Sequence, residues 1–222
     1  MKARKKLETG APHIQARFLA VYGSKGWSKY VDMVLEECAF PRAFEWNLLH
    51  SWIMQKSLLD MDGVLCADPT KEENDDGRNY RLFIKNARRL ALPSVSVRAV
   101  VTSRLERYRS ETEEWLVARG VSFEKLIMLD VPSATERRKL NLHSSFKADV
   151  YRRDPGAMLF IESDPQQAAE IAGQSGKAVL DYQNKVIASP DAYRLATQYR
   201  QSINGIRTLG QKISYRLRRG AR

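Results

Sequence analysis

Short apolar segments alternate with amphipathic ones through most of the chain. The apolar segments are four to seven residues long and typical of buried strands; they are 57–61, 95–101, 125–129, 157–161 and 177–180. Apolar positions at helical spacing fill the intervals 80–90, 104–119, 133–151 and 165–172. This alternation predicts an α/β fold, a Rossmann-like parallel sheet of about five strands with helices on both faces. Right-handed crossovers would place the first strand centrally if the second and third lie on one side and the last two on the other.

Residues with strong positional preferences mark the ends of several predicted helices. Ser133 and Glu136 form a capping-box pattern at the start of the third helix, and Pro165 opens the fourth. Gly120 follows the second helix, where a left-handed residue is expected. The stretch 66–79 is polar and acidic, so we expect a loop there.

The pattern predicts three parts: a partial N-terminal unit (1–55), the α/β domain (56–190) and a basic helical tail (191–222). Within the first part, residues 1–10 are basic and expected to be disordered. Residues 16–22 predict a strand that is followed by a glycine-rich turn. The segments 31–39 and 43–50 fit either a strand or a short helix.

Charge is unevenly distributed along the chain. The net charge is +11, yet residues 2–6 carry four basic side chains and the segment after Asp191 carries eight and no acid, which leaves −1 for residues 7–191. Binding of nucleic acid over the whole body is therefore disfavoured. The tail has Ile206, Leu209, Ile213 and Leu217 at helical spacing. It either packs on the body as an amphipathic helix or meets anionic lipid or nucleic acid.

No export or membrane signal is evident in the sequence. There is no run of about 18 apolar residues, and the N-terminus lacks the apolar stretch of a signal peptide. Cys38 and Cys66 are too few for a disulfide framework. We therefore expect a cytoplasmic protein, in which Cys66 is a packed thiol.

Polar side chains follow the predicted strands. Asp60 and Asp62 end the first strand, Thr102 follows the second, and Asp164 follows the fourth. Lys147 lies in the helix before the fourth strand, with Lys139 as the alternative. Because the carboxyl ends of parallel strands meet at one edge, these groups are expected to converge there. Acids for a metal, a hydroxyl and a cation suit phosphoryl transfer.

The order of these segments resembles the haloacid dehalogenase superfamily of phosphotransferases. Segment 60–65 (Asp-Met-Asp-Gly-Val-Leu) resembles its first motif, and segment 100–102 (Val-Val-Thr) its second. Lys147 is a candidate for the lysine of the third motif, and segment 159–165 resembles the fourth. The resemblance covers residues 57–185.

The resemblance implies a role for each candidate residue. Asp60 would be the nucleophile that forms an aspartyl-phosphate, and Asp62 the general acid and base. Thr102 and Lys147 would bind the phosphoryl oxygens of a phosphorylated substrate. Mg²⁺ would be held by Asp60, the backbone carbonyl of Asp62, and Asp164.

Two departures bear on this prediction. Where the family often has two adjacent acids, this chain has Ser163-Asp164, with Glu162 displaced by one residue. The intervals between the motifs are also too short for a cap domain, so we expect an open site with the acidic loop 68–76 as its lid.

The first 55 residues resemble the end of a phosphoribosyltransferase domain, although the phosphate-loop signature of that family does not occur. This resemblance implies that residues 10–55 bind a phosphoribosyltransferase-like chain or form a homo-oligomer. The alternative to a phosphatase or phosphotransferase is therefore a non-catalytic or regulatory module that is associated with a phosphoribosyltransferase.

Overall fold

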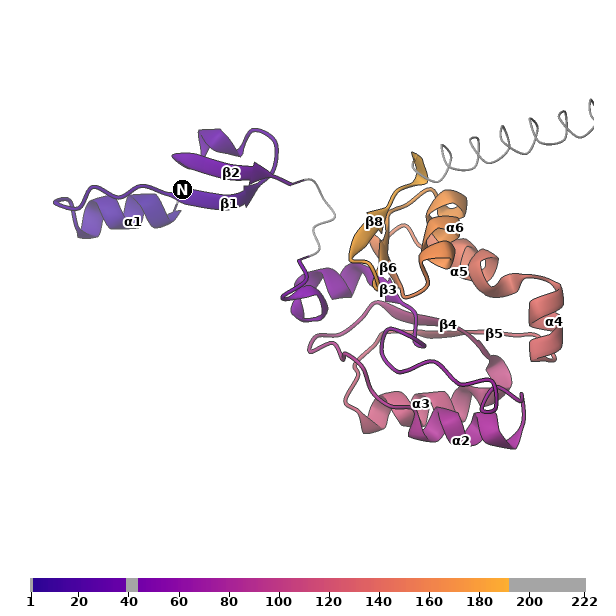
Figure 1. Ribbon diagram of the computed structural model, residues 1–222. Coiled ribbons are helices and arrows are strands. Elements are labelled where there is room, and N and C mark those ends of the chain that lie inside the picture. The colour runs from indigo at the N-terminus through magenta and orange to yellow at the C-terminus, as the bar shows by residue number, and fades with distance from the viewer. Residues whose placement is uncertain (1, 39–43, 192–222) are drawn as a thin grey trace, which may run out of the picture. The chain divides into compact units, whose positions relative to one another are not determined.

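The computed structural model describes residues 2–38 and 44–191 (Figure 1). The chain forms two compact units, of which the first ends at Phe44 and the second begins at Glu45. The second unit therefore takes in residues that the sequence pattern assigned to the N-terminal part. The predicted tail from residue 192 onward lies outside the described residues. No helix in the described part of the chain is long and apolar enough to cross a membrane.

A six-stranded sheet organises the second unit, in the order β5-β4-β3-β6-β7-β8. The strands are β3 (Ser57–Leu59), β4 (Ala99–Leu105), β5 (Leu126–Leu129), β6 (Leu159–Glu162), β7 (Val179–Asp181) and β8 (Val186–Ala188). The first five are parallel, and β8 pairs antiparallel with β7. The mixed α/β prediction is confirmed, and β3 lies between β4 and β6 as expected. The arrangement is compatible with a Rossmann-like fold.

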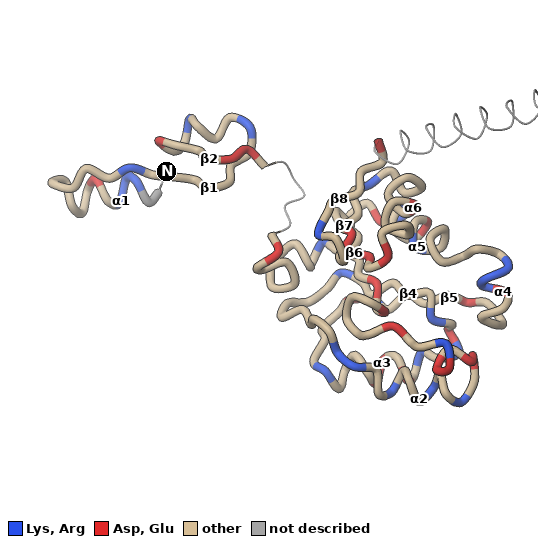
Figure 2. The backbone as a smooth tube through the Cα atoms, viewed as in Figure 1, with Lys and Arg blue, Asp and Glu red and all other residues tan. Residues whose placement is uncertain are grey.

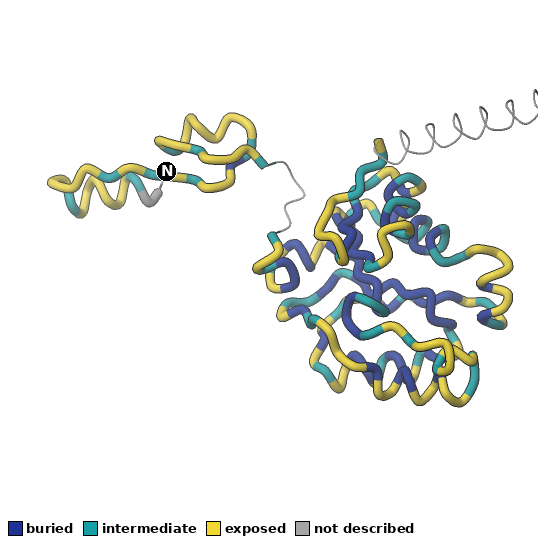
Figure 3. Tube along the Cα trace, viewed as in Figure 1, coloured by how far each residue is buried: buried dark blue, intermediate teal, exposed yellow. Residues whose placement is uncertain are grey.

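Helices cover both faces of this sheet (Figure 1). On one face lie α2 (Arg78–Asn86) and α3 (Arg109–Ala118); on the other lie α5 (Leu142–Arg153) and α6 (Pro165–Ser175). The remaining helices of this unit up to residue 191 are short: η2 (Leu48–His50), η3 (Trp52–Lys56), η4 (Glu106–Tyr108) and α4 (Ala134–Lys139). Burial follows the strands (Figure 3), and Phe160, Tyr151 and Ile171 belong to the core between the sheet, α5 and α6.

The Ser133 cap, the proline start of α6 and the glycine end of α3 form as predicted. The Ser133 hydroxyl accepts a hydrogen bond from the Glu136 amide at 3.1 Å at the start of α4. Pro165 stands in the first turn of α6, and Gly120 adopts φ 69° after α3. These contacts satisfy backbone groups that a helix end would otherwise leave unpaired.

Several expected boundaries were wrong, and one strand was missed. The helix over 133–151 is broken because Asn141 adopts a left-handed φ of 49°, which separates α4 from α5. Strand β4 runs past Val101 to Leu105, through a register shift against β5. Helix α2 ends at Asn86 because the next residues pair with the loop after β3. Strand β8 was missed, since its three residues give too short a signal.

The first unit contains α1 (Lys2–Gly10), β1 (Leu19–Gly23), η1 (Trp27–Lys29) and β2 (Met33–Glu37). Strands β1 and β2 are parallel neighbours, so the segment 31–39 contains a strand. The expectation of disorder over 1–10 was wrong: α1 forms, and Arg4 makes an ion pair with Asp32 at 2.6 Å. The same guanidinium lies 4.9 Å from the Phe18 ring centroid.

Candidate active site

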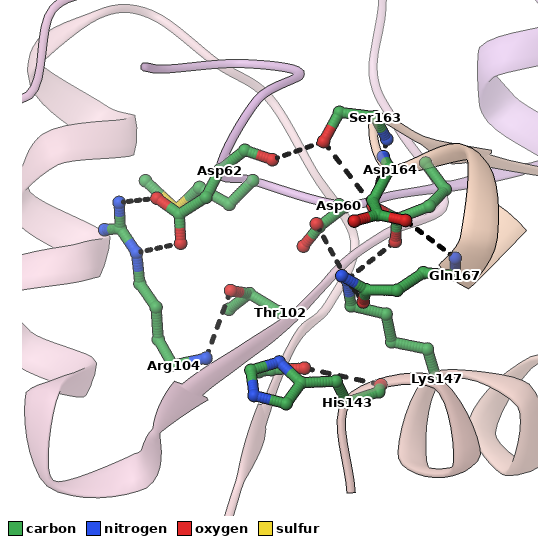
Figure 4. A network of polar contacts seen from close by, with 12 residues as sticks. Asp60, Asp62, Thr102, Arg104, His143, Lys147, Ser163, Asp164 and Gln167 are labelled. Atoms are coloured by element: carbon green, nitrogen blue, oxygen red, sulfur yellow. Dashed lines mark hydrogen bonds and ion pairs between the residues drawn. The ribbon is translucent and has the colours of Figure 1, made fainter. Parts of the chain in front are cut away.

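A cavity of about 810 Å³ opens at the carboxyl ends of β3, β4 and β6. All five candidate residues from the sequence line it: Asp60, Asp62, Thr102, Lys147 and Asp164. They come from three strand ends and from α5, and Figure 4 shows them around a common space. The structure thus brings together the residues that the strand-end pattern singled out, whereas the alternative lysine, Lys139, is exposed.

The Lys147 ammonium is buried between two carboxylates. Its Nζ donates to Asp60 Oδ2 at 2.8 Å and to Glu162 Oε2 at 2.6 Å, and the lysine is only 2% exposed. A third bond reaches Gln167 Oε1 at 3.2 Å. The other Glu162 oxygen accepts from the Ser163 and Asp164 amides at 2.9 and 3.1 Å. Glu162 is therefore a structural partner of Lys147, a role that the sequence did not reveal.

The carboxylates around this lysine exceed the positive charge available. Burial raises the pKa of Asp60 most; Lys147 opposes this rise, while the Glu162 and Asp62 charges add to it, and the result is about 8. Burial alone would lower the pKa of Lys147, but Asp60 and Glu162 raise it overall. The lysine is therefore charged at neutral pH, and Asp60 takes up a proton far more readily than an exposed aspartate.

Asp62 has a different partner. Arg104 Nη2 donates to Asp62 Oδ1 at 2.5 Å and Arg104 Nε to Oδ2 at 3.1 Å, and the arginine side chain is fully buried. Burial raises the pKa of Asp62, but Arg104 outweighs it, so the pKa is lowered overall. Asp62 is thus held as a carboxylate. The sequence pattern placed Arg104 at the start of a helix, so its pairing with Asp62 was not predicted.

Two further residues of this region, Thr102 and Cys66, have different environments. The Thr102 hydroxyl accepts from the Arg104 amide at 3.2 Å, so it stabilises the local turn of β4 as well as facing the cavity. Cys66 is buried, and desolvation raises the pKa of its thiol. The expectation that Cys66 is a packed thiol is consistent with this environment.

Ser163 lies against Gly63 at the point where β3 and β6 end. The serine hydroxyl donates to the Asp62 carbonyl oxygen at 3.2 Å, so the loops after the two strands are joined (Figure 4). Gly63 has φ 75°, and a Cβ at this position would meet the Ser163 Cβ at 2.6 Å. The site therefore requires glycine for both backbone conformation and space.

Replacing Gly63 by alanine is expected to lower the free energy of unfolding by about 2–4 kcal/mol, from left-handed strain and the clash with Ser163. Gly120→Ala is the matched control, since Gly120 has a similar φ of 69° but open space around an added Cβ. It should cost about 1–2 kcal/mol, from backbone strain alone. Urea unfolding of both variants measures the difference; equal losses would show that the contact with Ser163 is unimportant.

The oxygen chemistry of the site fits a hard cation. Within residues 2–38 and 44–191, no three or more His, Cys, Asp or Glu side chains form a metal-binding group. The ligands implied by the sequence are two carboxylates and one backbone carbonyl, so they include fewer than three such side chains. Asp60 directs its second oxygen away from Lys147 into the cavity (Figure 4), beside an excess of buried negative charge. Oxygen donors and excess negative charge are what Mg²⁺ requires.

No protein-family model matches this chain, and neither a curated protein nor a solved structure matches it. Its function is therefore inferred from the geometry and the electrostatics of the site.

Proposed function

We propose that the second unit is a Mg²⁺-dependent phosphatase or phosphotransferase of the capless haloacid dehalogenase type. One observation carries the proposal: Asp60 is buried at the end of the central strand, with one oxygen on Lys147 and the other toward the cavity. Once it has lost its proton, such an oriented, partly desolvated carboxylate suits a nucleophile in phosphoryl transfer, and a bound cation would favour the deprotonated form.

In the first half of the reaction, an oxygen of Asp60 attacks the phosphorus of a phosphomonoester. The bond from phosphorus to the leaving oxygen breaks, and the leaving alkoxide takes a proton. In the second half, a water attacks the aspartyl-phosphate, a base takes its proton, and inorganic phosphate leaves. Lys147 and Thr102 orient the nucleophile and the phosphoryl oxygens.

In the described structure, the protonation state of Asp62 suits only the second half of the reaction. Arg104 holds it as a carboxylate, the form that accepts a proton from the attacking water. Donating a proton to the leaving group requires protonated Asp62, so the contact with Arg104 must loosen when substrate binds. Asp60, the carbonyl of Asp62, and Asp164 would hold Mg²⁺, which would neutralise charge on the phosphoryl oxygens.

The full chain should release phosphate from a panel of phosphomonoesters in the presence of Mg²⁺ and lose this activity on chelation. Mg²⁺ together with a phosphate mimic should also raise the melting temperature, because both bind only the folded state. Absence of hydrolysis across the panel, combined with an unchanged melting temperature, would refute the proposal.

A binding role for the first unit is the second candidate. Four large apolar residues of its strands are each more than half exposed: Leu19, Val21, Met33 and Leu35. Parallel strands are normally covered on both faces, which favours a partner here, either a phosphoribosyltransferase-like chain or another copy. Changing Leu35 to glutamate should release such a partner, which gel filtration would detect. If the wild-type protein and the Leu35→Glu variant both elute as monomers, this role is excluded.

A further inference from the structure

Three basic side chains are buried in the described part of the chain, and all three line the cavity: Arg104, Arg137 and Lys147. Arg104 is paired with Asp62, and Lys147 with Asp60 and Glu162. Arg137 differs from both, because its guanidinium pairs with no carboxylate of the described residues. Nη1 donates to the Ser103 carbonyl oxygen at 2.6 Å, and Nε has no partner within the described structure.

A buried guanidinium without a counter-charge is unfavourable. Arg137 is only 8% exposed, so water solvates little of its charge. A single backbone carbonyl offers only a partial negative charge, and an unpaired buried nitrogen adds its own desolvation cost. An anion that enters the cavity would remove both penalties. The arrangement therefore favours a negatively charged ligand at this position.

The neighbours of Arg137 also line the cavity. Ser103 joins three elements there: its carbonyl accepts from Arg137 of α4, and its hydroxyl donates to the His143 carbonyl of α5 at 3.5 Å. Burial, followed by the Arg137 and Lys147 charges, lowers the pKa of His143 to about 4. The imidazole is therefore neutral at physiological pH and can donate a hydrogen bond to an anion.

These residues lie beside the proposed phosphoryl site, because Ser103 directly follows Thr102 in β4 and both line the cavity. Asp60 follows β3 and Asp164 caps α6, whereas α4 contributes basic residues (Figure 2). An anion on Arg137 is thus held next to the phosphoryl group that Asp60 would attack.

We propose that Arg137, Ser103 and His143 form a second anion-binding subsite, and that the substrate is a phosphomonoester whose leaving group carries another phosphate. The substrate class rests on the proposed phosphatase activity, but the subsite does not. With Nη1 on Ser103, the Nε and Nη2 edge of Arg137 is left for a planar pair of phosphate oxygens.

The test compares bisphosphates of short linear diols with the matching alkyl monophosphates. For at least one diol length, kcat/KM of the full chain should favour the bisphosphate by about 10–100-fold, as expected for charge-assisted hydrogen bonds. Arg137→Gln should bring this ratio close to one. The matched control is Arg138→Gln at the next, exposed position, which should preserve the ratio. A wild-type ratio near one, or a ratio that Arg137→Gln leaves intact, would overturn the subsite.

Failure of the phosphatase proposal is separable from failure of the subsite. In Asp60→Asn protein, calorimetry measures binding of the diol bisphosphate and monophosphate without turnover. Tighter bisphosphate binding that depends on Arg137 supports the subsite even when no substrate is hydrolysed. Equal binding of the two ligands rejects it. If Arg137→Gln fails to fold, the wild-type ratio and the ratio for Arg137→Lys decide instead. Arg137→Lys is expected to keep part of the preference for the bisphosphate.

Discussion

Replacing Lys147 by methionine is expected to lower the free energy of unfolding by about 3–5 kcal/mol, the usual effect of removing one partner from a buried charge cluster. Lys147 is the cation between Asp60 and Glu162, and it is 2% exposed. Without it, Asp60 and Glu162 are two buried acids with no positive charge between them, and at least one must hold a proton. The loss is measured by urea unfolding at pH 7.

Two variants control this experiment. Lys139→Met removes an exposed lysine eight positions earlier and should change stability by less than about 0.5 kcal/mol. The double variant Lys147→Met with Glu162→Gln removes one carboxylate as well, so much of the lost stability should return. Equal stability of the single and double variants would contradict the account of Lys147 as the charge partner of both acids.

The second large effect is expected from Asp60→Asn, which should lower phosphate release by about 10³-fold or more, since the oxygen proposed to attack phosphorus is lost. The same change should make the metal-free protein more stable at neutral pH. Lys147 keeps Glu162 as its partner, and a buried acid that must hold a proton at this pH is removed. Activity and stability should thus move in opposite directions, as they often do at catalytic sites.

This gain in stability depends on pH in a defined direction. The pKa of Asp60 is about 8 in the folded protein and 3.8 in its ordinary state. Between these values the unfolded chain releases a proton that the folded protein retains, so the Asp60 contribution weakens as pH rises. The advantage of asparagine should therefore be absent below pH 4 and largest near pH 8. Unfolding of both proteins with a chelator present at pH 5 and pH 8 measures it; a larger advantage at pH 5 would contradict the assignment.

Sequence reasoning located the strand-end groups well. The apolar segment before Asp60 and Asp62 is readily assigned as a buried strand. The crossover rule then places β3 beside both β4 and β6. The convergence of Thr102, Lys147 and Asp164 on the same cavity follows from that order.

The pairing of charges was not predictable in the same way. Arg104 reaches Asp62 because β4 shifts register after Thr102 and continues to Leu105. The spacing of apolar residues in the sequence does not indicate such a shift. Arg137 is buried on α4, a short helix that ends at Lys139 and that the sequence pattern did not separate from α5. Both arginines occupy positions that looked like ordinary solvated helix residues in the sequence.

The close approach of Gly63 and Ser163 has a consequence for engineering. The two positions lie 100 residues apart in the chain, yet the side chain allowed at one depends on the other. Gly63 leaves room for the Ser163 side chain, whereas a side chain at position 63 would meet that serine. Libraries that vary these sites independently would therefore contain many non-folding combinations, so the two codons should be randomised jointly.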